Sequence, residues 1–332
     1  MSASVSDTDR RGPPRKRDHG GGLDAAAARF GGTPHDWLDL STGINPVPYP
    51  LGDISAEAWH RLPGDGAMED LLHAARTFWN VPETAEIIAA AGASPLISLM
   101  PELAGGQPAH IPAPTYNEHA AAFAARGQGQ PFDDPAHPVH VYVHPNNPDG
   151  RLWPDAAGRA LTVIDESFCD VTPEASQIAR TAKPGTVVLK SFGKFWGLAG
   201  LRLGFAIAHP DTLRNTATGV PLSELMGPWT VSGPALEVGA RALRDTAWAE
   251  ATRTRLAADA ARLDALIQRT GATSVGGTTL FRTYAMPDRA AQWQEQLARH
   301  HIWSRIFPYS DTWLRLGLPG SERDWARLEA AL

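Results

Sequence analysis

A serine, a lysine and an arginine lie close together after one short apolar run, and their side chains could bind an anion. Ser191 and Lys194 follow the run Thr186 to Leu189, and Arg202 comes eight residues after the lysine. A hydroxyl, an amine and a guanidinium are the donors that a dianionic phosphate needs. Two glycines between the lysine and the arginine loosen the backbone, so we expect Arg202 to fold back towards Lys194. Alone, the lysine would more often be an ordinary solvated side chain.

Further donors for an anion are indicated where a helix is predicted to begin. Ser94 and Pro95 follow an apolar run and the turn Gly92-Ala93. Serine as the N-cap with proline at the first helical position is a strong start signal. Free N–H groups and the helix dipole attract anions to such a start. The same signal also marks many plain helix caps.

The elements that must position these groups predict an α/β fold with a mostly parallel sheet. Short apolar runs alternate with helical or turn segments between about residues 86 and 208. Ligands of such sheets gather at the carboxyl ends of the strands. The predicted strands are Glu86 to Ala91, Ala109 to Ile111, Val139 to Val143, Leu161 to Asp165, Thr186 to Ser191 and Leu203 to Ala208.

A smaller α+β region is predicted beyond about residue 220. A long helix is expected over Ala235 to Gln268, because Ala, Leu and Arg recur there with helical periodicity. We then expect two strands, Thr279 to Tyr284 and Ile302 to Phe307, and two helices, Ala290 to His301 and Glu322 to Leu332. The expected organisation is a basic tail (1–18), an N-terminal segment (19–45), a large domain (46–220) and a small domain (221–332).

Whole-chain composition narrows the classes of ligand and location. The chain has 332 residues with 30 Lys+Arg against 36 Asp+Glu, so no global field favours nucleic acid or an anionic membrane. Its single cysteine, Cys169, excludes an intramolecular disulfide framework and a Cys-rich zinc site, and it is expected only to pack. No run is apolar and long enough to span a membrane. These features favour a small-molecule ligand, no metal and a cytoplasmic location. The basic tail is expected to be a solvated, disordered segment, and a contact with nucleic acid is the weaker alternative.

The stretch from Ser191 to Gly204, SFGKFWGLAGLRLG, resembles the lysine motif of fold-type I pyridoxal-5'-phosphate (PLP) enzymes. Within that group it is similar to the branch of histidinol-phosphate aminotransferases and threonine-phosphate decarboxylases. The resemblance implies the aspartate-aminotransferase fold and a homodimer. It also implies that Lys194 carries PLP as a Schiff base, whereas the nearby Lys190 has the wrong spacing. The implied partners of the cofactor phosphate are Ala93, Ser94, Ser191 and Arg202.

Further motifs, in the same order along the chain, extend the resemblance to the cofactor ring. Alone, Asp165 would be a solvated carboxylate and the segment His144 to Gly150 a turn. By resemblance Asp165 pairs with the pyridinium nitrogen and keeps the ring an electron sink. Asn147 donates to the cofactor O3', and Tyr116, of Pro114-Thr115-Tyr116, stacks on the ring. Phe168 stands where many members have a tyrosine.

Elements near both ends of the chain favour the decarboxylase branch. His19-Gly20-Gly21 and Ser41-Thr42-Gly43-Ile44-Asn45-Pro46 resemble N-terminal elements of the threonine-phosphate decarboxylases of cobalamin biosynthesis. The implied substrate is L-threonine O-3-phosphate. The resemblance places His19, Asn45, Arg305 and Arg315 at the substrate, with Arg315 on its carboxylate and His19 at its phosphate.

Two other functions stay open at this point. An aminotransferase acting on histidinol phosphate or an aromatic amino acid would share every cofactor residue. A non-catalytic PLP-binding or scaffold protein would bind the cofactor without turnover. Two departures argue against a standard histidinol-phosphate aminotransferase: Leu62-Pro63-Gly64 replaces a Tyr-Pro-Asp element, and Gly193 replaces the more common serine or threonine before the lysine.

Overall fold

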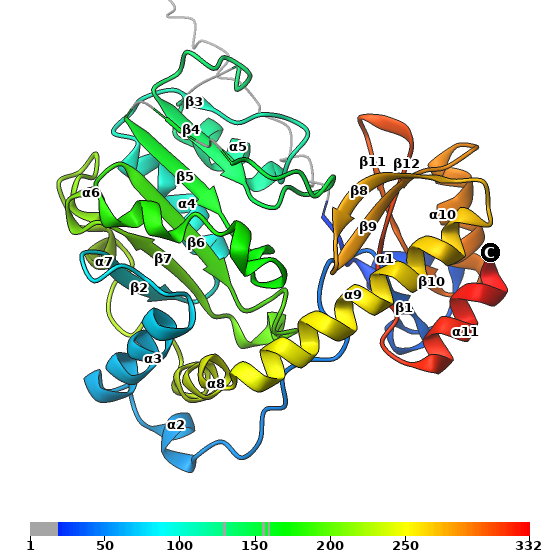
Figure 1. Cartoon of the computed structure of the whole chain (residues 1–332), viewed down its shortest axis with the longest axis horizontal. Helices are drawn as coiled ribbons and strands as arrows, with labels where there is room; N and C mark the ends of the chain where they lie inside the picture. Colours follow the sequence, from blue (N-terminus) through cyan, green and yellow to red (C-terminus); the bar gives the residue numbers. More distant parts are fainter. Residues whose placement is uncertain (1–18, 129–130, 155–156, 159) are drawn as a thin grey trace, which may run out of the picture.

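The chain folds into a larger and a smaller body that are joined by one long helix (Figure 1). A computed structural model describes residues 19–128, 131–154, 157–158 and 160–332. The predicted basic tail, residues 1–18, therefore lies outside the described residues. Throughout the described part, no helix combines the length and the apolar character that a membrane crossing requires.

A six-stranded sheet forms the centre of the larger body, in the order β2-β7-β6-β5-β4-β3. β7 runs antiparallel to both of its neighbours, and the other five strands all run in one direction. The predicted mostly parallel sheet is therefore confirmed. The predicted strands agree with the structure to within one residue at each end, because continuous buried apolar runs mark them clearly. Their bounds are β2 Glu86–Ala90, β3 Ala109–His110, β4 Val139–Val143, β5 Leu161–Asp165, β6 Thr186–Ser191 and β7 Gly204–Ala208.

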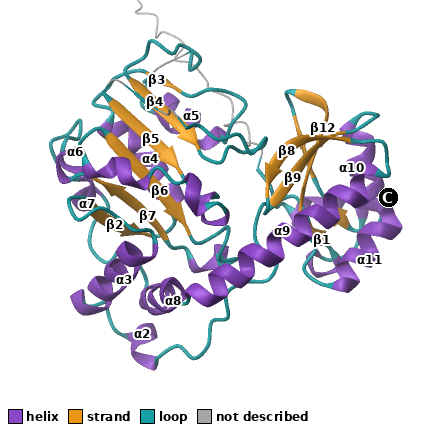
Figure 2. Cartoon of the chain, viewed as in Figure 1, coloured by secondary structure: helices purple, strands orange, loops and turns teal. Residues whose placement is uncertain are grey.

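Helices cover both faces of this sheet (Figure 2). One face packs its apolar side chains against α4 (Ala93–Leu103) and α5 (Asn117–Ala125), with α6 (Pro210–Arg214) and α7 (Leu222–Leu225) beside them. The other face packs against α3 (Asp65–Phe78) and α8 (Gly233–Arg244), and α2 (Ala56–His60) lies on α8. Residues on alternate strand positions thus enter two separate cores.

The single long helix predicted over Ala235 to Gln268 is wrong, because the chain forms two helices. α8 ends at Arg244, and α9 covers Thr246–Gln268. Between them Asp245 leaves the helical conformation and caps α9 by accepting a hydrogen bond from the Trp248 amide at 3.0 Å. The break lets α8 stay on α3 while α9 crosses to the smaller body (Figure 1).

The smaller body contains a four-stranded antiparallel sheet in the order β11-β12-β9-β8. The strand predicted over Ile302 to Phe307 is wrong as one element: β10 pairs with β1 in a separate sheet, and β11 pairs with β12. β8 and β12 were not among the predicted strands. The bounds are β1 Leu38–Asp39, β8 Thr273–Thr278, β9 Phe281–Ala285, β10 Ile302–Trp303, β11 Arg305–Phe307, β12 Ser310–Gly317, α1 Leu23–Phe30, α10 Ala290–Arg299 and α11 Glu322–Ala331.

The two bodies also meet through bare backbone, next to the loop of residues 144–150. A Cβ atom on Gly150 would lie 1.9 Å from the carbonyl oxygen of Gly277, and one on Gly276 would lie 2.1 Å from that of Asp149. The Thr283 hydroxyl of β9 donates to the Pro148 carbonyl at 2.5 Å. Glycine is therefore required at this seam, because any side chain would separate the two bodies.

Candidate active site

A cavity opens at the carboxyl ends of β4, β5 and β6, where they face the start of α4. It encloses about 620 Å³ together with the open space at its mouth. All eight residues predicted to hold the cofactor line it: Ala93, Ser94, Tyr116, Asn147, Asp165, Ser191, Lys194 and Arg202. The position agrees with the general placement of ligands in α/β sheets.

The start of α4 and Arg202 form one wall of this cavity. The helix begins at Ala93 with Gly92 as its N-cap, so the prediction of Ser94 as the N-cap is wrong. Proline is still accommodated in the first turn, where its missing N–H costs no helical hydrogen bond. A Cβ atom on Gly92 would lie 2.7 Å from an Arg202 guanidinium nitrogen. The glycine therefore lets a cation lie against the free N–H groups of the helix, and both attract a phosphate.

The turn that carries Lys194 is held from behind by the segment around residues 45–49. The Asn45 amide donates to the Lys194 carbonyl at 3.0 Å, and the Asn45 side chain donates to the Phe195 carbonyl at 2.8 Å. The Tyr49 amide donates to the Trp196 carbonyl at 2.9 Å. Trp196 is fully buried, so the turn packs against the hydrophobic core. The backbone that carries Lys194 is therefore held in place.

Lys194 and Lys190 lie four residues apart, yet their surroundings drive their pKa values in opposite directions. Desolvation lowers the pKa of the Lys194 amine to about 8, and Arg315 adds to this effect. Burial alone would lower the pKa of Lys190, but Glu166 and nearby carboxylates outweigh it and raise that pKa above its ordinary value. Lys194 alone of the two can supply a free amine near neutral pH, as a nucleophile requires.

Capture of PLP by the cofactor-free protein is expected to accelerate with pH around a midpoint of about 8. Below that midpoint the Lys194 amine is protonated and has no lone pair, and above it the amine is free to attack an aldehyde. Absorbance after mixing with PLP, followed across the midpoint, measures the rate. A midpoint at the ordinary lysine value of 10.5 would contradict the desolvated amine.

Asp165 is buried at the end of β5 and is held by two neighbours. His119 Nε2 lies 2.9 Å from one carboxylate oxygen, and the Ser167 amide and hydroxyl donate to the other at 3.0 and 2.5 Å. Burial alone would raise the pKa of Asp165, but the hydrogen bond from His119 and those from Ser167 outweigh burial and lower it. A carboxylate that stays ionised in this position can hold a proton on a ring nitrogen.

The loop 144–150 and the segment before α5 are joined by two side-chain hydrogen bonds. The Asn146 side chain donates to the Pro114 carbonyl at 3.0 Å and accepts from the Thr115 hydroxyl at 2.7 Å. Tyr116 and Asn147, which directly follow these bonded residues in the chain, both line the cavity. The Asn147 Oδ1 atom accepts from Arg315, which leaves its Nδ2 group to donate to a ligand.

A second cavity adjoins the first and shares Tyr116, Asn147, Phe168 and Lys194 with it. Three of the four residues predicted at the substrate line this cavity: His19, Arg305 and Arg315. Arg305 and Arg315 are directly paired across β11 and β12, so their side chains leave neighbouring positions of one sheet. Arg315 is buried and donates to the Ser41 carbonyl, and His19 Nε2 lies 2.9 Å from Glu118. Two cations beside the lysine suit a substrate with more than one negative charge.

The structure does not bring the fourth residue, Asn45, to either cavity. Its buried side chain is used within the protein: it donates to the Phe195 carbonyl and accepts from the Arg255 guanidinium at 2.6 Å. Arg255 belongs to α9, the helix that joins the two bodies. Asn45 thus connects that helix to the lysine turn.

Asn45→Ala is expected to lower kcat about tenfold while leaving KM nearly unchanged, because it removes hydrogen bonds worth about 1 kcal/mol each and no ligand contact. Steady-state kinetics of the PLP-loaded protein separate the two constants. Arg255→Met should produce a smaller change of the same kind. A rise in KM without a fall in kcat would show instead that Asn45 contacts the substrate.

Several residues of the site were not predicted from the sequence. His119 and Ser167, which hold Asp165, are two of them, whereas Thr42, Gly43 and Phe168, which line the second cavity, belong to motifs described above but had no assigned role. The Phe168 ring centroid lies 5.4 Å from Lys194 Nζ, and the ring packs edge-on against Phe281. Only the Ser167 contact is local in sequence, so spacing alone could have indicated that one contact.

The predicted departures from the related motifs are visible in the structure. Leu62 is exposed and lines a separate surface cavity with Pro63, and neither residue lines the cavity that contains Lys194. A Cβ atom on Gly193 would lie 3.3 Å from the Ala199 Cα atom, so a larger residue there would press on the loop that leads to Arg202.

Comparison with known proteins places these cavities in context. Residues 136–332 match the family "Aminotransferase class I and II". A threonine-phosphate decarboxylase from Pseudomonas aeruginosa is 39% identical over 334 residues, which cover 95% of this chain and 97% of the relative. A threonine-phosphate decarboxylase from Sinorhizobium sp is also 39% identical, over 95% of this chain and 97% of its own. A histidinol-phosphate aminotransferase from Symbiobacterium thermophilum is 28% identical over 81% of each chain.

Solved structures share the fold at low sequence identity. Histidinol-phosphate aminotransferase from Sinorhizobium meliloti, in complex with PLP, superposes with a TM-score of 0.78 at 18% identity, over 98% of this chain and 97% of the other. L-threonine-O-3-phosphate decarboxylase from Porphyromonas gingivalis superposes with a TM-score of 0.64 at 17% identity, over 88% of this chain and 97% of the other.

Proposed function

The chain belongs to the class I and II aminotransferase family and, within it, to the threonine-phosphate decarboxylases, and on this premise we propose that it decarboxylates L-threonine O-3-phosphate. The products are CO2 and (R)-1-aminopropan-2-ol O-phosphate. One observation of the structure supports this choice most directly. A cavity with Arg305, Arg315 and His19 adjoins the lysine, and its two guanidinium groups offer charged donors for both a carboxylate and a phosphate.

PLP is the cofactor, and the residues of the first cavity fit it. The free N–H groups of α4, the Ser191 hydroxyl and the Arg202 guanidinium are donors for a dianionic phosphate. The Gly92 position leaves room for that guanidinium, where a side chain would exclude it. The ionised Asp165 suits a protonated ring nitrogen, and the Lys194 amine suits an aldehyde. When bound, PLP supplies an electron sink for the bond that breaks at the substrate α-carbon.

The chain's own residues then have distinct tasks. Arg305 and Arg315 would bind the anionic groups of the substrate and so select which bond at the α-carbon is oriented for cleavage. In the proposed reaction the bond between the α-carbon and the carboxylate breaks, CO2 leaves, and a proton is added to the α-carbon. Lys194 Nζ, whose pKa of about 8 allows proton exchange near neutral pH, is the donor of that proton.

The function is tested by incubating the PLP-loaded protein with L-threonine O-3-phosphate and following CO2 and the amine by mass spectrometry. Equal amounts of CO2 and the phosphorylated amine, with no keto acid, are expected. A keto acid with pyridoxamine phosphate left on the protein would identify an aminotransferase instead. PLP binding without any turnover would identify a non-catalytic PLP protein.

We further infer a homodimer from one exposed apolar face. Trp59, Leu62 and Trp229 are 69%, 67% and 60% exposed, which is unusual for large apolar side chains grouped around a surface cavity. The same cavity is lined by Gly200 and Leu201, which directly precede Arg202 in the cofactor cavity. A second copy on this face would shield that exposed arginine from water.

Trp229→Asp is expected to convert the dimer into a monomer and to weaken PLP binding, because a charge would be buried in the contact. Sedimentation velocity measures the mass, and absorbance titration measures the affinity. Tyr309→Asp, at an exposed aromatic residue of the smaller body, is the matched control and should leave both unchanged. A monomeric wild-type protein with full activity would contradict the inference.

A further inference from the structure

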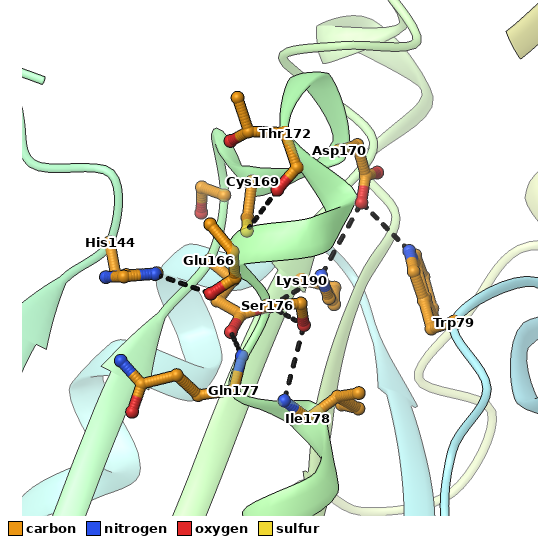
Figure 3. A network of polar contacts seen from close by, with 12 residues as sticks. Trp79, His144, Glu166, Cys169, Asp170, Thr172, Ser176, Gln177, Ile178 and Lys190 are labelled. Atoms are coloured by element: carbon orange, nitrogen blue, oxygen red, sulfur yellow. Dashed lines mark hydrogen bonds and ion pairs between the residues drawn. The ribbon is translucent and has the colours of Figure 1, made fainter. Parts of the chain in front are cut away.

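A buried cluster of charges lies behind the cofactor cavity, around Lys190 (Figure 3). Lys190 Nζ lies 2.7 Å from Glu166 Oε2 and 3.6 Å from Asp170 Oδ1, and all three residues are almost completely buried. The backbone amide of Gln177 and the Ser176 hydroxyl donate to the two Glu166 carboxylate oxygens at 2.6 and 2.7 Å. Every carboxylate oxygen of Glu166 therefore has a partner.

Asp170 extends the cluster to two tryptophans. Trp79, at the end of α3, donates to Asp170 Oδ1 at 2.9 Å, and Trp196 donates to Asp170 Oδ2 at 3.2 Å. The Arg253 side chain donates to the Asp170 carbonyl at 2.8 Å. The cluster thereby connects β5, β6, α3, α9 and the lysine turn in one network.

Ion pairs are an expensive way to fill a protein interior. The desolvation of two charges is often more unfavourable than their mutual attraction is favourable. A protein with apolar residues of equal volume in their place is frequently as stable. A contribution to stability is thus a weak explanation for the presence of this cluster. The location of the cluster suggests a different role.

Glu166, Lys190, Asp170 and Trp196 lie one or two positions along the chain from a residue that lines the cofactor cavity. Glu166 follows Asp165, Lys190 precedes Ser191, and Trp196 comes two residues after Lys194. Successive side chains of a strand point to opposite faces, so the Glu166 and Lys190 side chains lie on the back of the positions that face the cavity. The Glu166 backbone amide also donates to the Leu189 carbonyl at 2.9 Å, which continues the pairing with β6 one residue beyond the end of β5.

We propose that Lys190, Glu166 and Asp170 are positioning residues, and that their ion-pair cluster fixes Asp165, Ser191 and Lys194 relative to one another for binding PLP. This inference rests on the proposed function only in so far as the protein binds PLP. It requires no particular substrate. The lengths and charges of the three side chains allow only one arrangement of β5, β6 and the turn. Apolar side chains could fill the same volume in several arrangements.

The test is the double variant Glu166→Gln with Lys190→Met, which removes the close pair without changing the net charge or much volume. We expect a melting temperature close to that of the wild type. We also expect a PLP dissociation constant raised about tenfold or more and a shifted pH midpoint of the bound cofactor's absorbance. Wild-type affinity and midpoint in the folded double variant would overturn the proposal.

Two further variants keep the test decisive. Asp170→Asn keeps the shape and should shift the midpoint in the same direction, so that an unchanged midpoint there overturns the proposal even if the double variant does not fold. Arg282→Met removes a partly buried ion pair with Asp264, 2.9 Å apart in the smaller body, and should lower the melting temperature without moving the midpoint. None of these readouts uses L-threonine O-3-phosphate. A wild-type protein that fails to bind PLP would contradict the proposed function rather than the role of the cluster.

Discussion

Lys194→Ala is expected to abolish covalent attachment of PLP and to reduce decarboxylation by about 10⁴-fold or more, as removal of a nucleophile does in other enzymes. The amine lies at the junction of the two cavities, and its pKa of about 8 makes it the free amine of the site. Borohydride reduction followed by peptide mass spectrometry should place PLP on the wild-type peptide that contains Lys194. The same treatment should leave the variant unmodified.

Lys183→Ala is the matched control, because it deletes an exposed lysine amine outside both cavities. It should keep the activity, the modified peptide and the melting temperature of the wild type. Modification of Lys190 in either variant would contradict the assignment, since the carboxylates around Lys190 raise its pKa and hold its proton.

Asp165→Asn is expected to lower kcat by roughly 10²- to 10³-fold, the usual loss when one preorganised electrostatic partner is removed. The neutral amide cannot hold a proton on the ring nitrogen, so the cofactor becomes a weaker electron sink. The hydrogen bond from Ser167 can persist in the variant, and the fold should therefore be retained. Steady-state decarboxylation together with the absorbance of bound PLP measures the effect.

Asp211→Asn makes the same chemical change at an exposed side chain and should leave both measurements unaltered. His119→Ala should show a smaller loss in the same direction, because His119 orients the Asp165 carboxylate without replacing its charge. Full activity of Asp165→Asn would exclude the proposed role of the carboxylate.

The sequence was most informative where the signal is local. The strands of the larger sheet are continuous apolar runs, and their ends bring Asp165 and Ser191 to one edge. The residues predicted to hold the cofactor could be grouped from the sequence because they belong to a few short motifs. The motifs meet in one cavity once the strands are placed side by side.

The features of the site that could not be predicted depend on long-range contacts or on weak local signals. His119 and Asp165 are 46 positions apart and meet only when α5 packs on the sheet. Asn45 belongs to a motif near the substrate, but its side chain is taken up by Phe195 and Arg255, far away in sequence. No spacing rule connects such pairs, because the fold alone brings them together.

The smaller body was harder to predict for a related reason. β8 contains Gly276 and Gly277 and is largely exposed or half-buried, so it lacks the alternation typical of strands. The division of the segment around Ser304 into two strands is set by their partners, β1 and β12, rather than by its own residues. The capping pattern that starts at Asp245 was present in the sequence, but the helical periodicity on both sides obscured it.

The glycine seam between the two bodies limits how this protein can be redesigned. Because Gly150 and Gly276 touch the opposite main chain directly, any larger residue would act as a wedge and would move Arg315 relative to Asn147. Libraries that seek a new substrate should therefore leave these glycines, together with Gly277, unchanged and should vary the side chains that line the second cavity. A wedge at the seam would alter the spacing of every ligand contact at once, whereas a lining substitution alters one contact at a time.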